Sequence, residues 1–111
     1  MPDYILVCST TETREQAERI ARALVDVRLA ACVQIDGPIT SIYRWEGAVA
    51  QGEEWRLTAK TRASLFDEVA RVIRREHSYQ LPEIIAVPIT AGSANYLDWL
   101  ATETHPAADK T

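Results

Sequence analysis

The chain has 111 residues, a formal net charge of −4 at pH 7 and an isoelectric point near 5.1. Its 47% hydrophobic and 25% charged residues are typical of one globular domain, and its arginines are scattered among acids, which argues against nucleic acid as a partner. Two cysteines are too few for a disulfide framework, and the N-terminal apolar run is too short for a signal peptide or a membrane span. We therefore expect a cytoplasmic protein with no membrane partner.

The first predicted elements are a strand and a helix. Residues 4–9 form a short apolar, β-favouring run that ends in serine and threonine, which is typical of a buried strand. Thr13 and Gln16 then form a capping box, and apolar residues recur at helical spacing from Ala17 onward. This pattern predicts an amphipathic helix over about residues 13–28.

A long β-hairpin is predicted next. From Ala30 apolar and polar residues alternate, and the extended pattern continues to residue 45 after an interruption at Gly37-Pro38. Because proline cannot donate to a strand ladder, this pair predicts a bulge or a bend within the strand. Alternation returns over residues 54–60, so we expect the two strands to pair around the segment EGAVAQGE, residues 46–53.

The rest of the chain predicts a helix, a strand and a short helix. Residues 64–77 carry an apolar stripe with arginines outside it, and a loop containing proline follows. Residues 83–90 are typical of a strand, and the proline at position 88 predicts an edge position or a bulge. A short helix is expected over residues 93–103, and residues 104–111 are expected to be a polar, flexible tail.

The order of these elements predicts the fold class. A β-α-β-β-α-β order with a last helix is typical of the α+β, ferredoxin-like arrangement, in which an antiparallel sheet carries two helices on one face. Right-handed crossovers then give the sheet order 4-1-3-2. We place this single domain at residues 1–103.

The length of the hairpin predicts self-association. A strand over residues 30–45 would span roughly 50 Å, whereas a helix of about 15 residues covers only roughly 22 Å, so the hairpin should overhang the helices. The alternative is a bend at Gly37-Pro38 that folds the tip back over its own sheet. An overhang would expose apolar side chains unless other copies covered them, which favours a closed homo-oligomer. The predicted interface residues are Ile39, Ile42, Tyr43, Trp45 and Trp55.

A candidate metal site follows from the same topology. The first strand and the second helix run in the same direction, so Cys8 and His77 are expected at the same end of the sheet. Thiolate and imidazole are ligands that suit copper or zinc, and Glu76 or Glu83 could add a carboxylate. We take Cys8, His77 and Glu76 as candidate metal ligands.

Each of these side chains also has a plainer interpretation. Cys8 can be a small hydrophobe in a strand, as can Cys32, and His77 can serve only to end its helix. A thiol-imidazole nucleophile would need an orienting third residue and an oxyanion donor, and neither can be identified in the sequence. We therefore expect no catalytic residue and no enzymatic activity. The cluster of Tyr43, Trp45 and Trp55 could line a pocket, although aromatic residues at hairpin spacing usually pack across strands.

Five stretches in this sequence resemble the CutA family of divalent-cation tolerance proteins. They are LAACVQI, ITSIYRWEG, EEWRLTAKTRASLF, HSYQLPEIIAVPI and NYLDWL, and the similarity extends from about Tyr4 to Leu100. The chain departs from the family pattern at Ala48, where lysine is usual, at Ser78, where proline is usual, and at Gln34, where asparagine is common.

The resemblance implies a compact homotrimer closed by the long hairpins, and a role in tolerance to divalent metals, copper especially. It also implies copper contacts at Cys8 and His77. Where some family members have two adjacent histidines, this chain has Glu76 before His77.

Together with this resemblance, the sequence predicts a non-enzymatic homotrimer that binds copper or other divalent metal ions weakly. One rival is a PII-like small-molecule sensor or signalling protein with ligand clefts between subunits. The other is a structural or scaffold protein whose trimeric face docks an unidentified protein partner.

Overall fold

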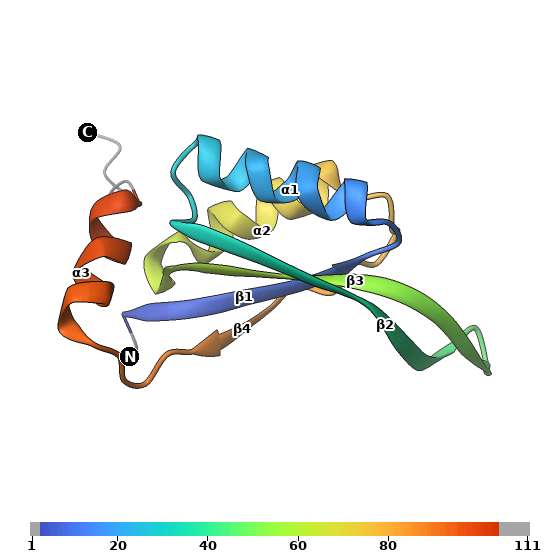
Figure 1. Ribbon diagram of the computed structural model, residues 1–111. Helices are drawn as coiled ribbons and strands as arrows, with labels where there is room; N and C mark the ends of the chain where they lie inside the picture. The colour runs from blue at the N-terminus through green and yellow to red at the C-terminus, as the bar shows by residue number, and fades with distance from the viewer. Residues whose placement is uncertain (1–2, 105–111) are drawn as a thin grey trace.

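The computed structural model describes residues 3–104 and shows one antiparallel sheet with two helices packed on one of its faces (Figure 1). The elements are β1 (Tyr4–Thr11), α1 (Arg14–Asp26), β2 (Cys32–Trp45), β3 (Ala48–Arg62), a 3₁₀ turn (Ala63–Leu65), α2 (Phe66–Glu76), β4 (Ile85–Pro88) and α3 (Ala94–Glu103). The sheet order is β2-β3-β1-β4 and all pairs are antiparallel, which confirms the predicted α+β arrangement and its 4-1-3-2 order.

The core lies between the sheet and the helices α1 and α2. The Thr13 side chain accepts a hydrogen bond of 3.1 Å from the backbone N–H of Gln16, as the capping box predicts, and α1 begins there. The apolar stripes of the two helices meet the inward-facing positions of the strands. The fully buried side chains include Val7, Ile20, Leu24, Leu57, Leu65, Val69 and Ile73.

The helices α1 and α2 cover one face of the sheet and leave the opposite face open. The helix α3 packs at the end of the sheet away from the hairpin tip (Figure 1), where the Lys60 ammonium donates to the Tyr96 hydroxyl at 3.2 Å. Most strand residues on this open face, among them Cys8, Thr58 and Lys60, are partly exposed. This face therefore carries side chains that the fold does not need for its core.

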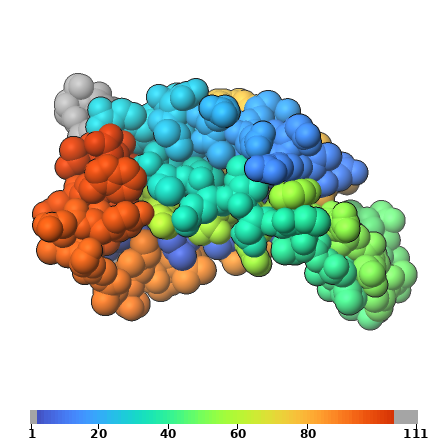
Figure 2. Space-filling model, viewed as in Figure 1, coloured from blue at the N-terminus to red at the C-terminus, as the bar shows by residue number. Residues whose placement is uncertain are grey.

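The hairpin extends well past the helices, and its tip does not fold back over its own sheet (Figure 1). In space-filling form it projects from the body of the molecule (Figure 2), whose principal extents are 45 × 29 × 24 Å. The exposed fractions of Ile42, Tyr43 and Trp45 are 68%, 46% and 44%. The predicted overhang is therefore present, with large apolar side chains exposed along it.

The irregularity expected at Gly37-Pro38 is also present. Strand pairing slips between Asp36 and Ile39, and Gly37 has a φ of 153°. A Cβ atom at Gly37 would lie 2.8 Å from a ring carbon of Trp55, so only glycine fits without a shift. At this break in β2 the backbone of Gly37 therefore lies close against the ring of Trp55.

Two predicted boundaries were wrong. The hairpin turn is only Glu46-Gly47, both with positive φ, as in a type I′ turn, and most of the predicted connection belongs to β3. The strand β4 is only four residues long because it is an edge strand that pairs with Ile5 to Cys8 alone.

Thr104, the last described residue, is anchored to β3 and α3. This residue is buried, its hydroxyl bonds to the carbonyl of Leu100, and the Arg62 guanidinium donates to it at 3.0 Å. Residues 105–111 lie outside the described residues, so the flexible tail and the exact domain limit stay predictions. No helix among residues 3–104 is long and apolar enough to cross a membrane.

Candidate functional site

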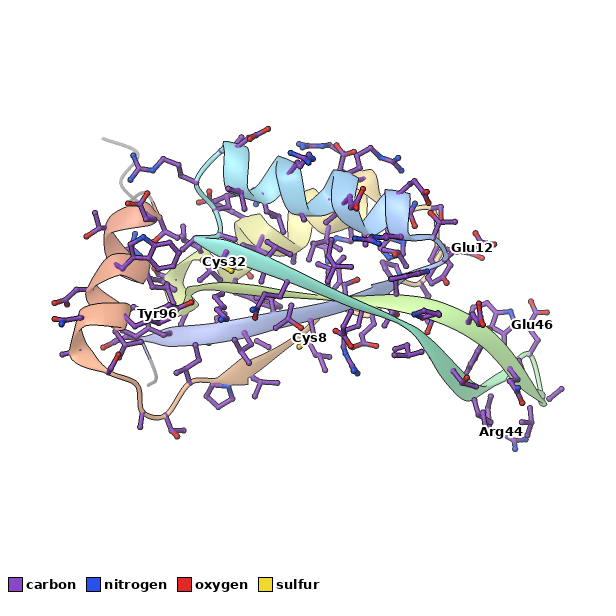
Figure 3. All side chains as sticks on the ribbon, viewed as in Figure 1. Cys8, Glu12, Cys32, Arg44, Glu46 and Tyr96 are labelled. Atoms are coloured by element: carbon purple, nitrogen blue, oxygen red, sulfur yellow. The ribbon has the colours of Figure 1, made fainter. Side chains whose placement is uncertain are left out.

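Cys8 lies on the open face of the sheet (Figure 3). It alternates along β1 with Val7 and Ser9, which are buried on the helix side, so its side chain points away from α1 and α2. Burial raises the pKa of the Cys8 thiol, and the nearby Glu83 carboxylate raises it further, against opposing effects of a Thr58 hydrogen bond and of Arg56. The thiol form is therefore favoured, and a metal ion must displace its proton.

His77 ends α2 and fastens the next loop to β1. Its Nε2 lies 2.7 Å from the carbonyl oxygen of Thr10, and its Nδ1 accepts a hydrogen bond of 3.1 Å from the backbone N–H of Tyr79. Because the Tyr79 group can only donate, the ring proton is on Nε2 and is donated to Thr10. Both ring nitrogens therefore already have backbone partners.

Glu76 is held on the helix layer by two arginines. Its carboxylate lies 3.8 Å from Arg19 Nε and 3.4 Å from Arg75 Nε. These are partly exposed ion pairs that contribute little stability, but they orient the carboxylate toward cations of the protein itself.

The three predicted ligands therefore do not form a ready metal site. Cys8 faces the open side of the sheet, while His77 and Glu76 bond to Thr10 and to arginines. Among residues 3–104 there is no group of three or more His, Cys, Asp or Glu side chains placed to hold a metal ion. The topology does bring His77 to the end of β1, two residues beyond Cys8. It cannot decide the face, because consecutive strand residues point to opposite sides.

A cleft of about 340 Å³ lies between the overhanging part of the hairpin and the loop that follows α2. It is lined by Thr10, Tyr43, Trp45, Glu54, Tyr79, Gln80, Leu81 and Glu83. Two members of the predicted aromatic cluster, Tyr43 and Trp45, line it. The third, Trp55, packs against the core beneath Gly37, and the Arg14 guanidinium lies 5.7 Å from the centre of its ring.

Glu54 is the fixed polar group of this cleft. One of its carboxylate oxygens accepts a hydrogen bond of 2.6 Å from the Ser41 hydroxyl, and the other accepts one of 2.9 Å from the Tyr79 phenol. Burial raises the pKa of Tyr79, and the hydrogen bond to Glu54 raises it further, so the phenol stays a donor. The network joins the hairpin to the loop after α2.

Sequence reasoning did not identify Glu54 or Tyr79. The one local signal was the alternation of side chains along the strand: Glu54 and Arg56 are two residues apart and therefore point to the same, open face. Nothing local marks Tyr79, because its partner lies 25 residues away in the chain.

Residues 5–103 match the CutA1 divalent ion tolerance protein family. The chain is 43% identical over 104 residues to the divalent-cation tolerance protein CutA of Thermus thermophilus, covering 94% of this chain and 99% of that protein. It is 43% identical over 100 residues to the chloroplastic protein CutA of Arabidopsis thaliana, covering 90% of this chain and 55% of that one. This chain therefore spans about half the length of the plant relative.

Solved structures agree with this assignment. The crystal structure of CutA1 from Oryza sativa has a TM-score of 0.92 and 39% identity, covering 96% of this chain and 97% of that one. The Thermus thermophilus protein has a TM-score of 0.89, covering 92% and 99%. This chain belongs to the CutA1 divalent ion tolerance protein family, and it is a non-enzymatic protein of divalent-cation tolerance.

Proposed function

We propose that this protein acts in divalent-cation tolerance as a homotrimer that binds copper or another divalent ion weakly, with Cys8 as the principal ligand of each subunit. The observation that carries the proposal is the position of Cys8, a partly exposed thiol on the open face of the sheet. The Glu83 carboxylate is close enough for its negative charge to raise the pKa of that thiol. Sulfur is a soft ligand that favours copper, and a carboxylate adds negative charge to the site.

His77 and Glu76 have a conditional part in this proposal. Either can join Cys8 only after its present bonds to Thr10, Tyr79 or the arginines break. Loss of those bonds offsets part of the metal–ligand energy. Weak affinity that depends mainly on Cys8 is the expected result.

The trimer is supported by the exposed hairpin. Apolar side chains along an uncovered edge strand invite association, and a closed ring of identical subunits hides them without leaving a free edge. Ile39, Ile42, Tyr43 and Trp45 lie along β2 of that hairpin, whereas Trp55 is already half-buried against its own core. We therefore place the contact mainly on β2.

Cellular location is a separate matter. Among relatives, the Arabidopsis protein is named chloroplastic and the Archaeoglobus fulgidus structure is described as periplasmic. Because family membership does not fix a compartment, the cytoplasmic location of this protein stays a prediction.

Calorimetric titration of Cu(II), with redox-inert Zn(II) in parallel, tests metal binding. Cys8→Ser should abolish measurable binding, and His77→Ala should change the affinity by less. Cys32→Ser is the matched control because it removes a second partly exposed thiol from the same face. Unchanged stoichiometry and affinity in Cys8→Ser would overturn the proposal.

A second candidate function is a PII-like small-molecule sensor, and the cleft beside Glu54 and Tyr79 favours it. Its volume falls within the range of small-molecule sites, and it combines aromatic and polar side chains. Since Tyr43 and Trp45 belong both to the cleft and to the proposed interface, a neighbouring subunit would border it. A thermal-shift screen of nucleotides and metabolites tests this function, because a specific ligand raises the melting temperature.

A further inference from the structure

We propose that the cleft beside Glu54 and Tyr79 binds an organic cation, an ammonium or guanidinium group carried by a small molecule. This inference rests on the second candidate function, a small-molecule site in that cleft, and adds the chemical class of its ligand. Three features of the cleft carry it, namely the sign of its charge, its aromatic lining and its fixed hydrogen-bond network.

The charge of the cleft is negative. Its described lining includes the carboxylates of Glu54 and Glu83 and contains no lysine, arginine or histidine. Glu12 adds negative charge nearby, since its carboxylate also helps to raise the pKa of the Tyr79 phenol. The nearby Arg56 guanidinium lies 3.1 Å from the Asp36 carboxylate, and its charge also acts on Glu83, so Arg56 offsets part of the Glu83 charge while Glu54 keeps its own. An anionic ligand would therefore meet like charge, and a cation would meet opposite charge.

The lining is also rich in aromatic rings. Tyr43, Trp45 and Tyr79 all border the cleft, and in the isolated subunit Tyr43 and Trp45 keep nearly half of their surface exposed. The electron-rich faces of such rings attract organic cations, and tryptophan does so most strongly. Aromatic rings do not ligate metal ions, so the cleft suits an organic cation better than a bare metal ion.

The central carboxylate is held in place before a ligand arrives. Ser41 and Tyr79 each donate one hydrogen bond to Glu54, and each of its oxygens keeps a second lone pair for a ligand. The raised pKa of Tyr79 keeps its phenol protonated and its ring neutral. A ligand therefore does not have to order this group, which lowers the entropic cost of binding.

The test uses choline with two molecules of nearly the same shape, neutral 3,3-dimethylbutan-1-ol and anionic 3,3-dimethylbutanoate, and methylguanidinium as a second cation. Binding is followed by NMR on the indole N–H of Trp45, with the indole of Trp99 on α3 as an internal control. At least one cation should shift the Trp45 signal in a saturable manner and leave Trp99 unchanged. It should bind about tenfold more tightly than the neutral isostere.

Variants separate charge from shape. Glu54→Gln and Glu83→Gln should each weaken cation binding several-fold and weaken binding of the neutral isostere by much less. Glu53→Gln is the matched control, because it lies next to Glu54 but outside the lining. Glu83 is exposed, so its variant remains informative if Glu54→Gln fails to fold.

The outcomes distinguish this inference from the function on which it rests. If the neutral or anionic isostere binds as tightly as the cations, the class is wrong while a small-molecule site stands. If neither cation shifts Trp45 and another metabolite does, the class is again wrong. If no compound of this panel or of the metabolite screen binds the cleft, both proposals fail.

Discussion

The phenol of Tyr79 donates a hydrogen bond of 2.9 Å to the carboxylate of Glu54, and this bond ties the loop after α2 to the overhanging hairpin. The loop is fixed at its other end by His77, whose ring bonds to Thr10 and to the Tyr79 backbone. The two side chains of the loop thus hold it against β1 and β3 at once.

Tyr79→Phe should destabilise the protein by about 1 kcal/mol, because it removes one partly buried hydrogen bond and leaves the ring in place. Chemical denaturation at fixed protein concentration measures the change. Tyr96→Phe is the control, since the Tyr96 hydroxyl makes an exposed contact with Lys60 and should matter less. Equal losses in the two variants would show that the Glu54 bond adds nothing.

The same phenol predicts a dependence on alkaline pH. The pKa of Tyr79 is raised above its ordinary value of 10.0, first by burial and then by Glu54. The folded state therefore holds this proton more tightly than the unfolded state does. The resulting stability is fully present below pH 10 and is lost as the pH rises above it. Unfolding free energies from pH 8 to 11 should fall more steeply for the wild type than for Tyr79→Phe; parallel curves would contradict this.

Gly37→Ala should cost about 1–3 kcal/mol, because the backbone is in a region that alanine rarely adopts and the new Cβ would press on Trp55. Gly52→Ala is the matched control in the same hairpin, since a Cβ there has open space around it. Its effect should stay within about 0.5 kcal/mol. Thermal and chemical unfolding of both variants measure the difference, and a tolerated Gly37→Ala would mean that the hairpin shifts freely at this point.

The sequence predicted the elements whose cause is local. The helical stripes of Leu24 and Val69, the cap at Thr13 and the alternation around Val33 each act within a few residues, and each was confirmed. The early start of β3 at Ala48 was missed because its first residues include glycine and polar side chains. Pairing with β2 keeps that segment extended, and such pairing is a tertiary effect.

The candidate site was harder to predict for a different reason. Topology brought His77 to the end of β1, but the face on which Cys8 points depends on strand parity. The run from Ile5 to Cys8 is apolar without alternation, and Ser9 is polar although it is buried, so the sequence carried no signal for the face of Cys8. The pair of Glu54 and Tyr79 had no signal either, since it depends on where the loop after α2 meets the hairpin.

Glu83→Gln should make Cys8 easier to alkylate. The Glu83 carboxylate helps to raise the pKa of the Cys8 thiol, so its removal lowers that pKa and increases the thiolate fraction near pH 8. The rate of Cys8 alkylation by iodoacetamide, measured in a Cys32→Ser background, should rise by roughly twofold or more. The midpoint of the curve of this rate against pH should move to lower pH. Added salt should shrink the difference, because it screens partly exposed charges. Unaltered rates would place Glu83 too far away to assist a metal at Cys8.

Ile42→Asp should weaken or abolish the proposed trimer. Ile42 is 68% exposed on β2 of the hairpin, so an aspartate there costs the isolated subunit little, yet it would be buried without a partner charge in an assembly. Light scattering coupled to size-exclusion chromatography should show a trimer for the wild type and smaller species for the variant. Val27→Asp is the control, because Val27 is an exposed apolar residue at the end of α1, away from the hairpin. A wild type that is monomeric, or an Ile42→Asp variant that remains trimeric, would remove β2 of the hairpin from the assembly.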